Sequence, residues 1–208
     1  IKMDSNRKTA IIVGVLFLAG YVGVFVGSAI YGPILKDPDY LSNIYPNKTQ
    51  LIIGMLVEVL LNDVPVVGIG VLLFPILKKQ NEALALGYVA SRMIEAVTII
   101  VGLISLLALL TVSEEHMRAG APDAADLQAS GALLLSVIDR ALLLGVEFVF
   151  SLTALILNYV LFRSKLVPRI ISIWGLVGAA LLLVSGFLVM FGLSPGPTSA
   201  ISMLLSIP

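Results

Sequence analysis

The chain has 208 residues, of which 59% are hydrophobic and 12% charged, and its formal net charge is +0. Soluble domains are nearer half apolar and a quarter charged, so this composition is typical of a chain buried in lipid, and the balanced charge argues against nucleic acid as a partner. Cysteine is absent and His116, the single histidine, lies in a polar loop, which excludes disulfides, thiolate metal sites, thiol catalysis and histidine ligation of a haem inside the membrane.

Apolar segments long enough to cross a bilayer, which takes about 20 residues in a helix, recur along the chain. They run over residues 9–31, 50–77, 83–112, 131–162 and 170–193, and a shorter apolar run covers residues 200–208. We therefore predict an all-α fold: a single transmembrane helical domain over residues 1–208, an integral membrane helical bundle with five complete transmembrane helices plus the start of a sixth. We expect the sixth span to continue past Pro208.

Lysine and arginine are distributed unevenly between the polar segments. The N-terminal tail and the loops after the second and fourth spans hold most of them, and the remaining loops are rich in acids. Because positive loops stay in the cytoplasm, we expect a multi-pass protein of the cell membrane with a cytoplasmic N-terminus. The outer segment 32–49, which contains several prolines and tyrosines, is expected to fold back onto the bundle. The cations that set this orientation are Lys2, Arg7, Lys8, Lys78, Lys79, Arg163, Lys165 and Arg169.

Small residues repeat at four-residue spacing on the first and fifth spans. Small side chains let helix backbones approach closely in lipid, but glycine is also common in membrane helices, so the spacing leaves both explanations open. The residues concerned are Ala19, Gly23 and Gly27 on the first span and Gly175 and Ala179 on the fifth.

Charged side chains occur inside the second, third and fourth spans, whereas the first and fifth spans have none. Each costs about 2.5 to 3.5 kcal/mol at the bilayer centre on insertion scales, so we expect these three spans to turn their polar faces towards each other. The candidate intramembrane polar cluster consists of Glu58, Asn62, Asp63, Arg92, Glu95, Asp139, Arg140 and Glu147.

Helical spacing and depth predict which of these side chains meet. Arg92 and Glu95 are three residues apart and can pair on one helix face. Glu58 and Arg140 are expected at one level in the membrane and are candidates for a pair, with Asp139 as the alternative partner of Arg140. A single stripe on the fourth span is expected to hold Ser136, Arg140, Glu147, Ser151 and Asn158.

The polar cluster contains five acids against two arginines. An excess of buried negative charge is costly, so some carboxyls are expected to be protonated, hydrogen-bonded to neutral partners, or hydrated by a cavity. Such carboxyls suit proton coupling, and a cluster of oxygens would also suit a hard cation such as Na⁺ or Ca²⁺. The paired groups have a simpler explanation, which is that they hold the helices together, and both explanations stay open.

Pro65 stands in the middle of the second span, directly after Asn62, Asp63 and Val64. Proline removes one backbone hydrogen bond from a helix, and membrane helices tolerate this where polar groups or water satisfy the freed carbonyl. The sequence therefore predicts a break here, either a pliable segment that faces a cavity or a static kink.

Three segments carry a resemblance to a known family: FPILKK at residues 74–79, GYVASRMIE at 87–95 and LVPRIISIWG at 166–175, together with PILKDPDYL at 33–41. With these motifs nearly the whole chain resembles the bacterial and archaeal membrane family called domain of unknown function 4386. The resemblance implies six transmembrane spans. It implies no reaction, and no catalytic residue can be carried over from it.

Motifs that mark an enzyme are missing from this sequence: it has no Ser–His pair, no H-E-x-x-H and no nucleotide-binding loop. We expect no catalytic residue, no cofactor and no dedicated metal site. Our first interpretation is a small transporter or channel-like protein with a polar intramembrane cavity, surrounded by membrane lipids, with a proton or hard cation as its ligand. The alternative is a non-catalytic membrane subunit or sensor that binds a lipid or a protein partner, which includes a second copy of the chain.

The predicted orientation can be tested by labelling, because a chain without cysteine accepts single cysteines with no other change. We expect an impermeant thiol reagent to label Glu115→Cys in intact cells and to leave Lys79→Cys unlabelled until the cells are opened. Labelling of Lys79→Cys but not of Glu115→Cys in intact cells would show that the orientation is reversed.

Overall fold

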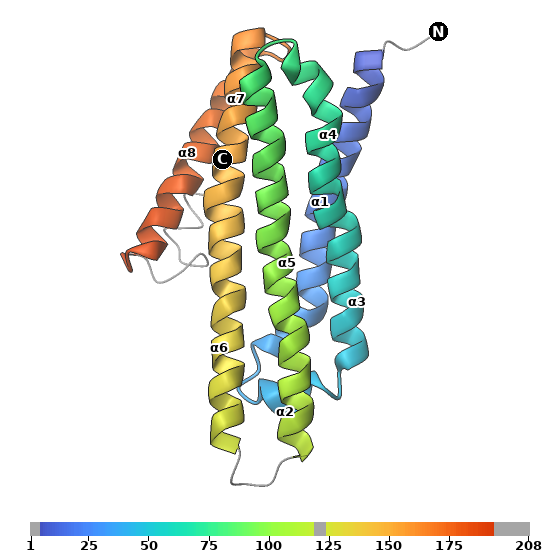
Figure 1. The fold of residues 1–208 in the computed structure, drawn as a ribbon, viewed down its shortest axis with the longest axis vertical. Helices are drawn as coiled ribbons and strands as arrows, with labels where there is room; N and C mark the ends of the chain where they lie inside the picture. Colours follow the sequence, from blue (N-terminus) through green and yellow to red (C-terminus); the bar gives the residue numbers. More distant parts are fainter. Residues whose placement is uncertain (1–4, 119–123, 194–208) are drawn as a thin grey trace. The chain divides into compact units, whose positions relative to one another are not determined.

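The computed structural model describes residues 5–118 and 124–193 (Figure 1). Among these residues, five helices are long and apolar enough to cross a membrane, at Arg7–Leu35, Lys48–Lys78, Glu82–Arg118, Ala125–Ser164 and Arg169–Met190. The predicted all-α, multi-pass membrane fold is therefore confirmed. The apolar run at residues 200–208 lies outside the described residues, and the orientation in the membrane stays a prediction.

Two of these spans change from α-helix to π-helix and back, a wider turn in which each N–H bonds the carbonyl five residues earlier. Within the described ranges no strand occurs. The elements are α1 (Ser5–Leu35), α2 (Tyr40–Ile44), α3 (Lys48–Glu58), the π-helix η1 (Val59–Asp63), α4 (Val64–Lys78), α5 (Glu82–Arg118), α6 (Ala124–Leu142), the π-helix η3 (Leu143–Phe150), α7 (Ser151–Ser164) and α8 (Arg169–Met190).

The contacts between helices group the chain into two compact units. The first unit comprises Ile1–Val13, Val67–Thr98 and Leu142–Pro208, and the second comprises Gly14–Val66 and Ile99–Ala141. The boundaries between the units fall inside long helices, so a helix such as α5 contributes residues to both units. The expectation of a single domain stays a prediction, and each unit is described by itself.

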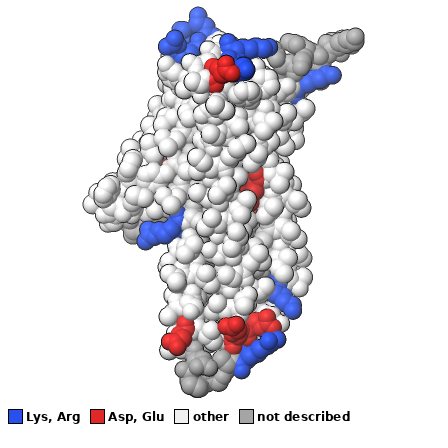
Figure 2. All heavy atoms as spheres, viewed as in Figure 1, with Lys and Arg blue, Asp and Glu red and all other residues white. Residues whose placement is uncertain are grey.

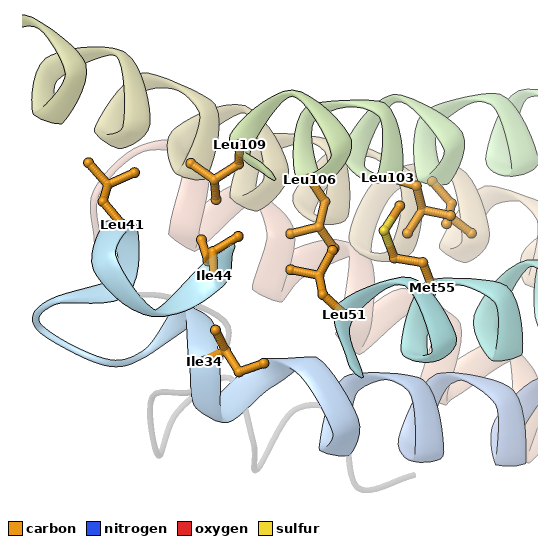
Figure 3. Close-up of a cluster of buried hydrophobic side chains, with 9 residues drawn as sticks. Ile34, Leu41, Ile44, Leu51, Met55, Leu103, Leu106 and Leu109 are labelled. Atoms are coloured by element: carbon orange, nitrogen blue, oxygen red, sulfur yellow. The ribbon is translucent and has the colours of Figure 1, made fainter. Parts of the chain in front are cut away.

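The second unit is built on an apolar core that includes the short helix α2 (Figure 3). The Ser113 hydroxyl of α5 ties this helix down, because it donates to the carbonyl of Leu41 and accepts from the N–H of Tyr45 at 2.9 Å. Tyr40 packs where α6 has Gly131, and burial raises the pKa of its hydroxyl. The prediction that segment 32–49 folds back is confirmed. The core residues are Ile34, Leu41, Ile44, Leu51, Met55, Ile99, Leu103, Leu106 and Leu109.

Helix α1 approaches α3 and η1 through its glycines. A Cβ on Gly27 would lie 2.9 Å from the carbonyl oxygen of Gly54, and a Cβ on Gly54 would lie 3.0 Å from the carbonyl oxygen of Gly27. A Cβ on Gly23 would meet the Cβ of Leu61 at 2.7 Å. The packing role predicted for Gly23 and Gly27 is therefore confirmed, and the two backbones touch where an alanine would not fit.

In the first unit, α8 packs on α7 and η3 in a similar way. Asn158 of α7 occupies the space that a side chain on Gly175 would need, with its Oδ1 only 2.3 Å from the position of the missing Cβ. Phe148 and Phe187 meet edge to face with ring centroids 5.0 Å apart, a favourable aromatic geometry. The predicted packing role of Gly175 is confirmed, and Ala179 is also buried.

The outward faces of the helices carry large apolar side chains. Leu18 and Phe25 of α1 are 68% and 69% exposed, and Ile170 of α8 is 75% exposed. In the face drawn in Figure 2, charged side chains gather mostly at the helix ends and the surface between them is largely uncharged. Lipid tails are the natural solvent for such surfaces.

We predict that the Gly27–Gly54 contact is needed for stability. Gly27→Ala should lower the free energy of unfolding by about 1 to 3 kcal/mol, because the added methyl group meets backbone and cannot be accommodated by a side-chain rotation. Gly14→Ala is the matched control on the same helix, since nothing lies within 4 Å of its Cβ position, and it should be neutral or stabilising by up to about 1 kcal/mol. The measurement is thermal unfolding of both variants in detergent, and equal shifts for the two would contradict the contact.

Candidate functional site

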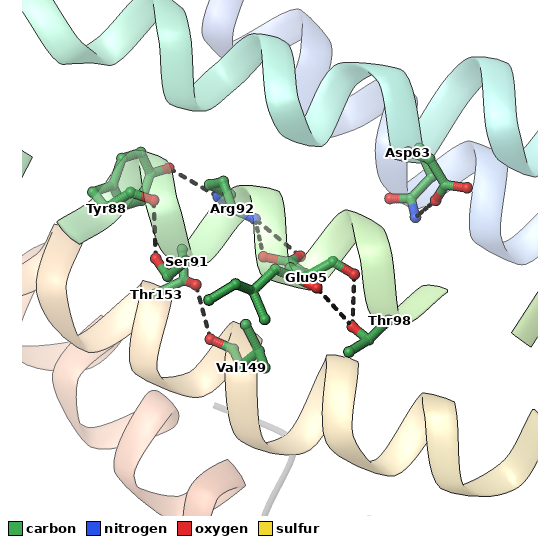
Figure 4. A network of polar contacts seen from close by, with 10 residues as sticks. Asp63, Tyr88, Ser91, Arg92, Glu95, Thr98, Val149 and Thr153 are labelled. Carbon is green, nitrogen blue, oxygen red and sulfur yellow. Dashed lines mark hydrogen bonds and ion pairs between the residues drawn. The ribbon is translucent and has the colours of Figure 1, made fainter. Parts of the chain in front are cut away.

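Arg92 of α5 is the centre of a buried polar network in the first unit (Figure 4). Its Nη1 donates to both carboxylate oxygens of Glu95, at 3.1 and 3.0 Å, and its Nε donates to the Tyr88 hydroxyl at 3.1 Å. Arg92 and Glu95 are 2% and 4% exposed. The pairing predicted from their spacing is confirmed, and Tyr88, one turn earlier, extends the same face.

The surroundings of this network are aromatic and closely packed. The Arg92 guanidinium lies over the rings of Tyr88 and Phe150, 5.4 and 5.6 Å from their centroids, at distances typical of cation–π contacts. Gly70 of α4 allows the approach, because a Cβ there would be 3.3 Å from that of Arg92. The aromatic partner Phe150 lies 58 positions away in the sequence, so helical spacing alone could not identify it.

Glu58 of the second unit finds a neutral partner. The hydroxyl of Tyr31, at the end of α1, donates to Glu58 Oε2 at 2.6 Å. Glu58 is 5% exposed and sits beside the close contact at Gly27, where a Cβ would lie 3.2 Å from its own Cβ. Sequence reasoning missed Tyr31, the last residue of the predicted first span, because nothing in local spacing links two residues 27 positions apart.

The expected pair between Glu58 and Arg140 is wrong. Asp139 and Arg140 are both exposed on α6, and neither takes part in an ion pair or hydrogen bond with the other described residues. The expectation assumed that every charge in a span must face the bundle interior. On this helix the two charges instead occupy the outer surface of their unit.

The break predicted at Pro65 is present as the π-helix η1, which ends two residues before it. The N–H of Val64 bonds the carbonyl of Val59, five residues earlier, and Pro65 has no N–H with which to continue an α-helical pattern. Asn62 and Asp63 lie in this segment and are buried, and the Asn62 amide donates to Asp63 Oδ1 at 3.2 Å. Whether this break is pliable or static stays a prediction.

Glu147 lies in the other π-helix, η3. Of the buried carboxyl groups in the first unit, it has the fewest hydrogen-bond and ion-pair partners among the described residues. It is 5% exposed, and the Ser185 hydroxyl of α8 lies beside its carboxyl group. Neither Glu147 Oε2 nor Ser185 Oγ meets a hydrogen-bond partner in good geometry among the described residues. No described cation forms an ion pair with Glu147.

Hydroxyl groups at the start of α7 support this π-helix. Ser151 donates to the carbonyl of Glu147, and Thr153 donates to the carbonyl of Val149 at 2.8 Å. Side-chain hydroxyls that bond the carbonyl four residues earlier compete with the regular helix pattern and bend helices. The two hydroxyls therefore donate hydrogen bonds to carbonyl groups of the π-helix.

The single polar stripe predicted on the fourth span is wrong. Ser136 and Arg140 are exposed, whereas Glu147 and Ser151 are buried and Asn158 is half-buried. The prediction applied one α-helical period throughout, and the wider turns of η3 intervene between Arg140 and Ser151. Ser185 was missed for another reason, since a serine in a charge-free span gives only a weak signal.

The carboxyls do not form a cluster suited to a metal ion within the described residues, where no three acidic or histidine side chains come together. The expectation of a proton or hard cation as ligand stays a prediction. The common level expected for Asp63, Glu95 and Glu147 involves both units and stays a prediction.

The family model described as "Domain of unknown function (DUF4386)" matches residues 12–208. The chain belongs to this family. The resemblance inferred from the motifs is thereby confirmed, and a membrane protein is consistent with it. No curated protein and no solved structure matches the chain.

The geometry predicts a structural role for Arg92. Arg92→Leu should leave the Glu95 carboxylate buried without its cationic partner and lower the free energy of unfolding by about 3 to 5 kcal/mol. The double variant Arg92→Leu, Glu95→Gln should recover part of this loss, because no buried charge remains. Thermal unfolding in detergent is the measurement. Arg140→Leu serves as the comparison, and a larger loss there than at Arg92 would contradict the assignment.

Proposed function

We propose that this member of the family is a small proton-conducting membrane protein of channel or transporter type, and that Glu147 is the carboxyl group that takes up and releases the proton. The observation that carries the proposal is the buried Glu147 carboxyl, which has an unpartnered oxygen and no cation to neutralise it among the described residues. An ionised carboxylate in such a place is costly, so a bound proton is its natural counter-ion.

Two of the other buried acids, Glu95 and Glu58, differ from Glu147 in ways that support this choice. Glu95 is held by Arg92 in two hydrogen bonds, and Glu58 accepts from Tyr31. A carboxylate that is paired with a buried arginine gains little from binding a proton. Within residues 5–118 and 124–193, Glu147 has the Ser185 hydroxyl beside its carboxyl group and forms no ion pair, so protonation and deprotonation of Glu147 break no ion pair there.

The backbone at Glu147 also favours a functional role. π-helical turns are rare and occur frequently at functional sites, because the wider turn frees carbonyl groups and can be converted back to α-helix. Glu147 lies within such a turn, and its own carbonyl is bonded by the Ser151 hydroxyl. Movement of the proton at the side chain can therefore be linked to a change in the helix.

Proton flux into liposomes tests this function. With purified protein, a pH-sensitive dye inside and an imposed potential, we expect the wild type to conduct protons above empty liposomes and Glu147→Gln to lose at least tenfold of that flux. Glu82→Gln is the matched control, because Glu82 is an exposed acid at the start of α5 paired with Lys78, and it should conduct like the wild type. Absence of wild-type flux, or unchanged flux in Glu147→Gln, would contradict the proposal.

A second candidate function, a subunit or sensor that binds a protein partner, is favoured by a separate observation. Asp139 and Arg140 are exposed inside a membrane-spanning helix, and exposed charges in such a place call for a partner. That surface is independent of Glu147, so the two candidate functions do not exclude each other.

A further inference from the structure

The surface of α6 around Asp139 and Arg140 is unusual because two charges are exposed at membrane depth. Their level is fixed by the neighbouring helix, since Gly102 of α5 lies beside Ala141, with its Cβ position 3.6 Å from the Ala141 Cβ. From Gly102 the chain runs without a charge to Glu114, twelve residues on, which is about 18 Å of helix. The two charges therefore lie inside the apolar span Ala125–Ser164, and more than a headgroup layer away from the level of Glu114.

Among residues 5–118 and 124–193, no side chain forms an ion pair with either of them. Adjacent helical residues do not face each other, so Asp139 and Arg140 do not pair with each other. Residues 194–208 contain no charged side chain. Arginine could extend towards the headgroups, but the short side chain of Asp139 could not.

We propose that this face of α6 is a homodimer interface, in which Asp139 of each copy pairs with Arg140 of the other. Because the two residues are adjacent, they differ in depth by only about 1.5 Å. A two-fold axis along the membrane normal relates copies of the same orientation and keeps every residue at its depth. Such an isologous interface brings residue i to j and j to i, so the dimer contains two such pairs and each charge has one partner on the other copy.

The rest of the face fits a neighbouring helix. Ala132 and Ser136 precede Arg140 at four-residue spacing, and all three are exposed. Small residues allow two membrane helices to approach closely, and polar contacts between helices strengthen association in lipid. The inference depends on the pairing of Asp139 with Arg140. The small side chains of Ala132 and Ser136 only allow a second helix to come close enough for that pairing. The inference does not rest on the proposed proton conduction, because it uses the exposed surface of α6 and not the Glu147 carboxyl.

Disulfide cross-linking in native membranes tests the interface. Ser136→Cys, one turn from Arg140, should give a covalent dimer on mild oxidation. Ile104→Cys is the control at nearly the same depth on α5, where the side chain is 59% exposed, and it should stay monomeric. If Ser136→Cys gives no covalent dimer while Asp139 and Arg140 are unchanged, the proposal is overturned. The two charges would then be covered by another protein or by lipid.

Charge exchange then separates this pairing from nonspecific contact. In the Ser136→Cys background, Asp139→Arg and Arg140→Asp should each lower the dimer yield at least fivefold, because like charges then face each other. The double exchange should restore it, and so should co-expression of the two single variants with different tags. If a single variant does not accumulate, the double exchange still decides the question. Equal yields in all variants, or no restoration by either route, would overturn the proposed pairing.

Discussion

Lipid can neither hydrogen-bond to a helix nor drive two apolar helices together, so the packing of this protein depends on close backbone contact and on polar groups satisfied within the protein. The contact of Gly27 with Gly54 meets the first requirement, since each glycine occupies space that a methyl group would need. The network of Arg92, Glu95 and Tyr88 meets the second. Both keep polar side chains or backbone atoms away from lipid. Their first role is therefore to stabilise the packing of the helices.

The two π-helical segments follow from the same requirement, although their local causes differ. At η1 Pro65 has no N–H to continue the α-helical pattern. Directly before it, the N–H of Val64 bonds the carbonyl of Val59, five residues earlier. At η3 the hydroxyls of Ser151 and Thr153 bond carbonyls of the preceding turn. Each segment carries a buried acid, Asp63 or Glu147. In these two spans each wider turn thus contains a buried acid.

Much of the fold could be predicted from hydropathy, because the length and polarity of a membrane span are set by the bilayer: the predicted span 50–77 corresponds to Lys48–Lys78. Contacts within one α-helical turn were also accessible, as for Arg92 and Glu95. Contacts between helices were not, which is why Tyr31 was missed as the partner of Glu58. The position of Arg140 was wrong because its assignment required an unbroken α-helical period and an interior place for every charge. Neither condition can be checked from spacing alone.

The charge balance still favours a functional carboxyl after these corrections. Asp139 and Arg140 leave the interior together, so their removal changes no net charge. Four acids and one arginine remain buried, namely Glu58, Asp63, Glu95, Glu147 and Arg92, and the excess of acid predicted from the sequence persists. Glu95 and Glu58 have strong partners, and Asp63 accepts from Asn62. The group left with the weakest compensation is Glu147. If the chain needed only structural bonds, glutamine at this position would provide hydrogen bonding without a buried charge, so the presence of an ionisable group is itself an argument that the proton matters there.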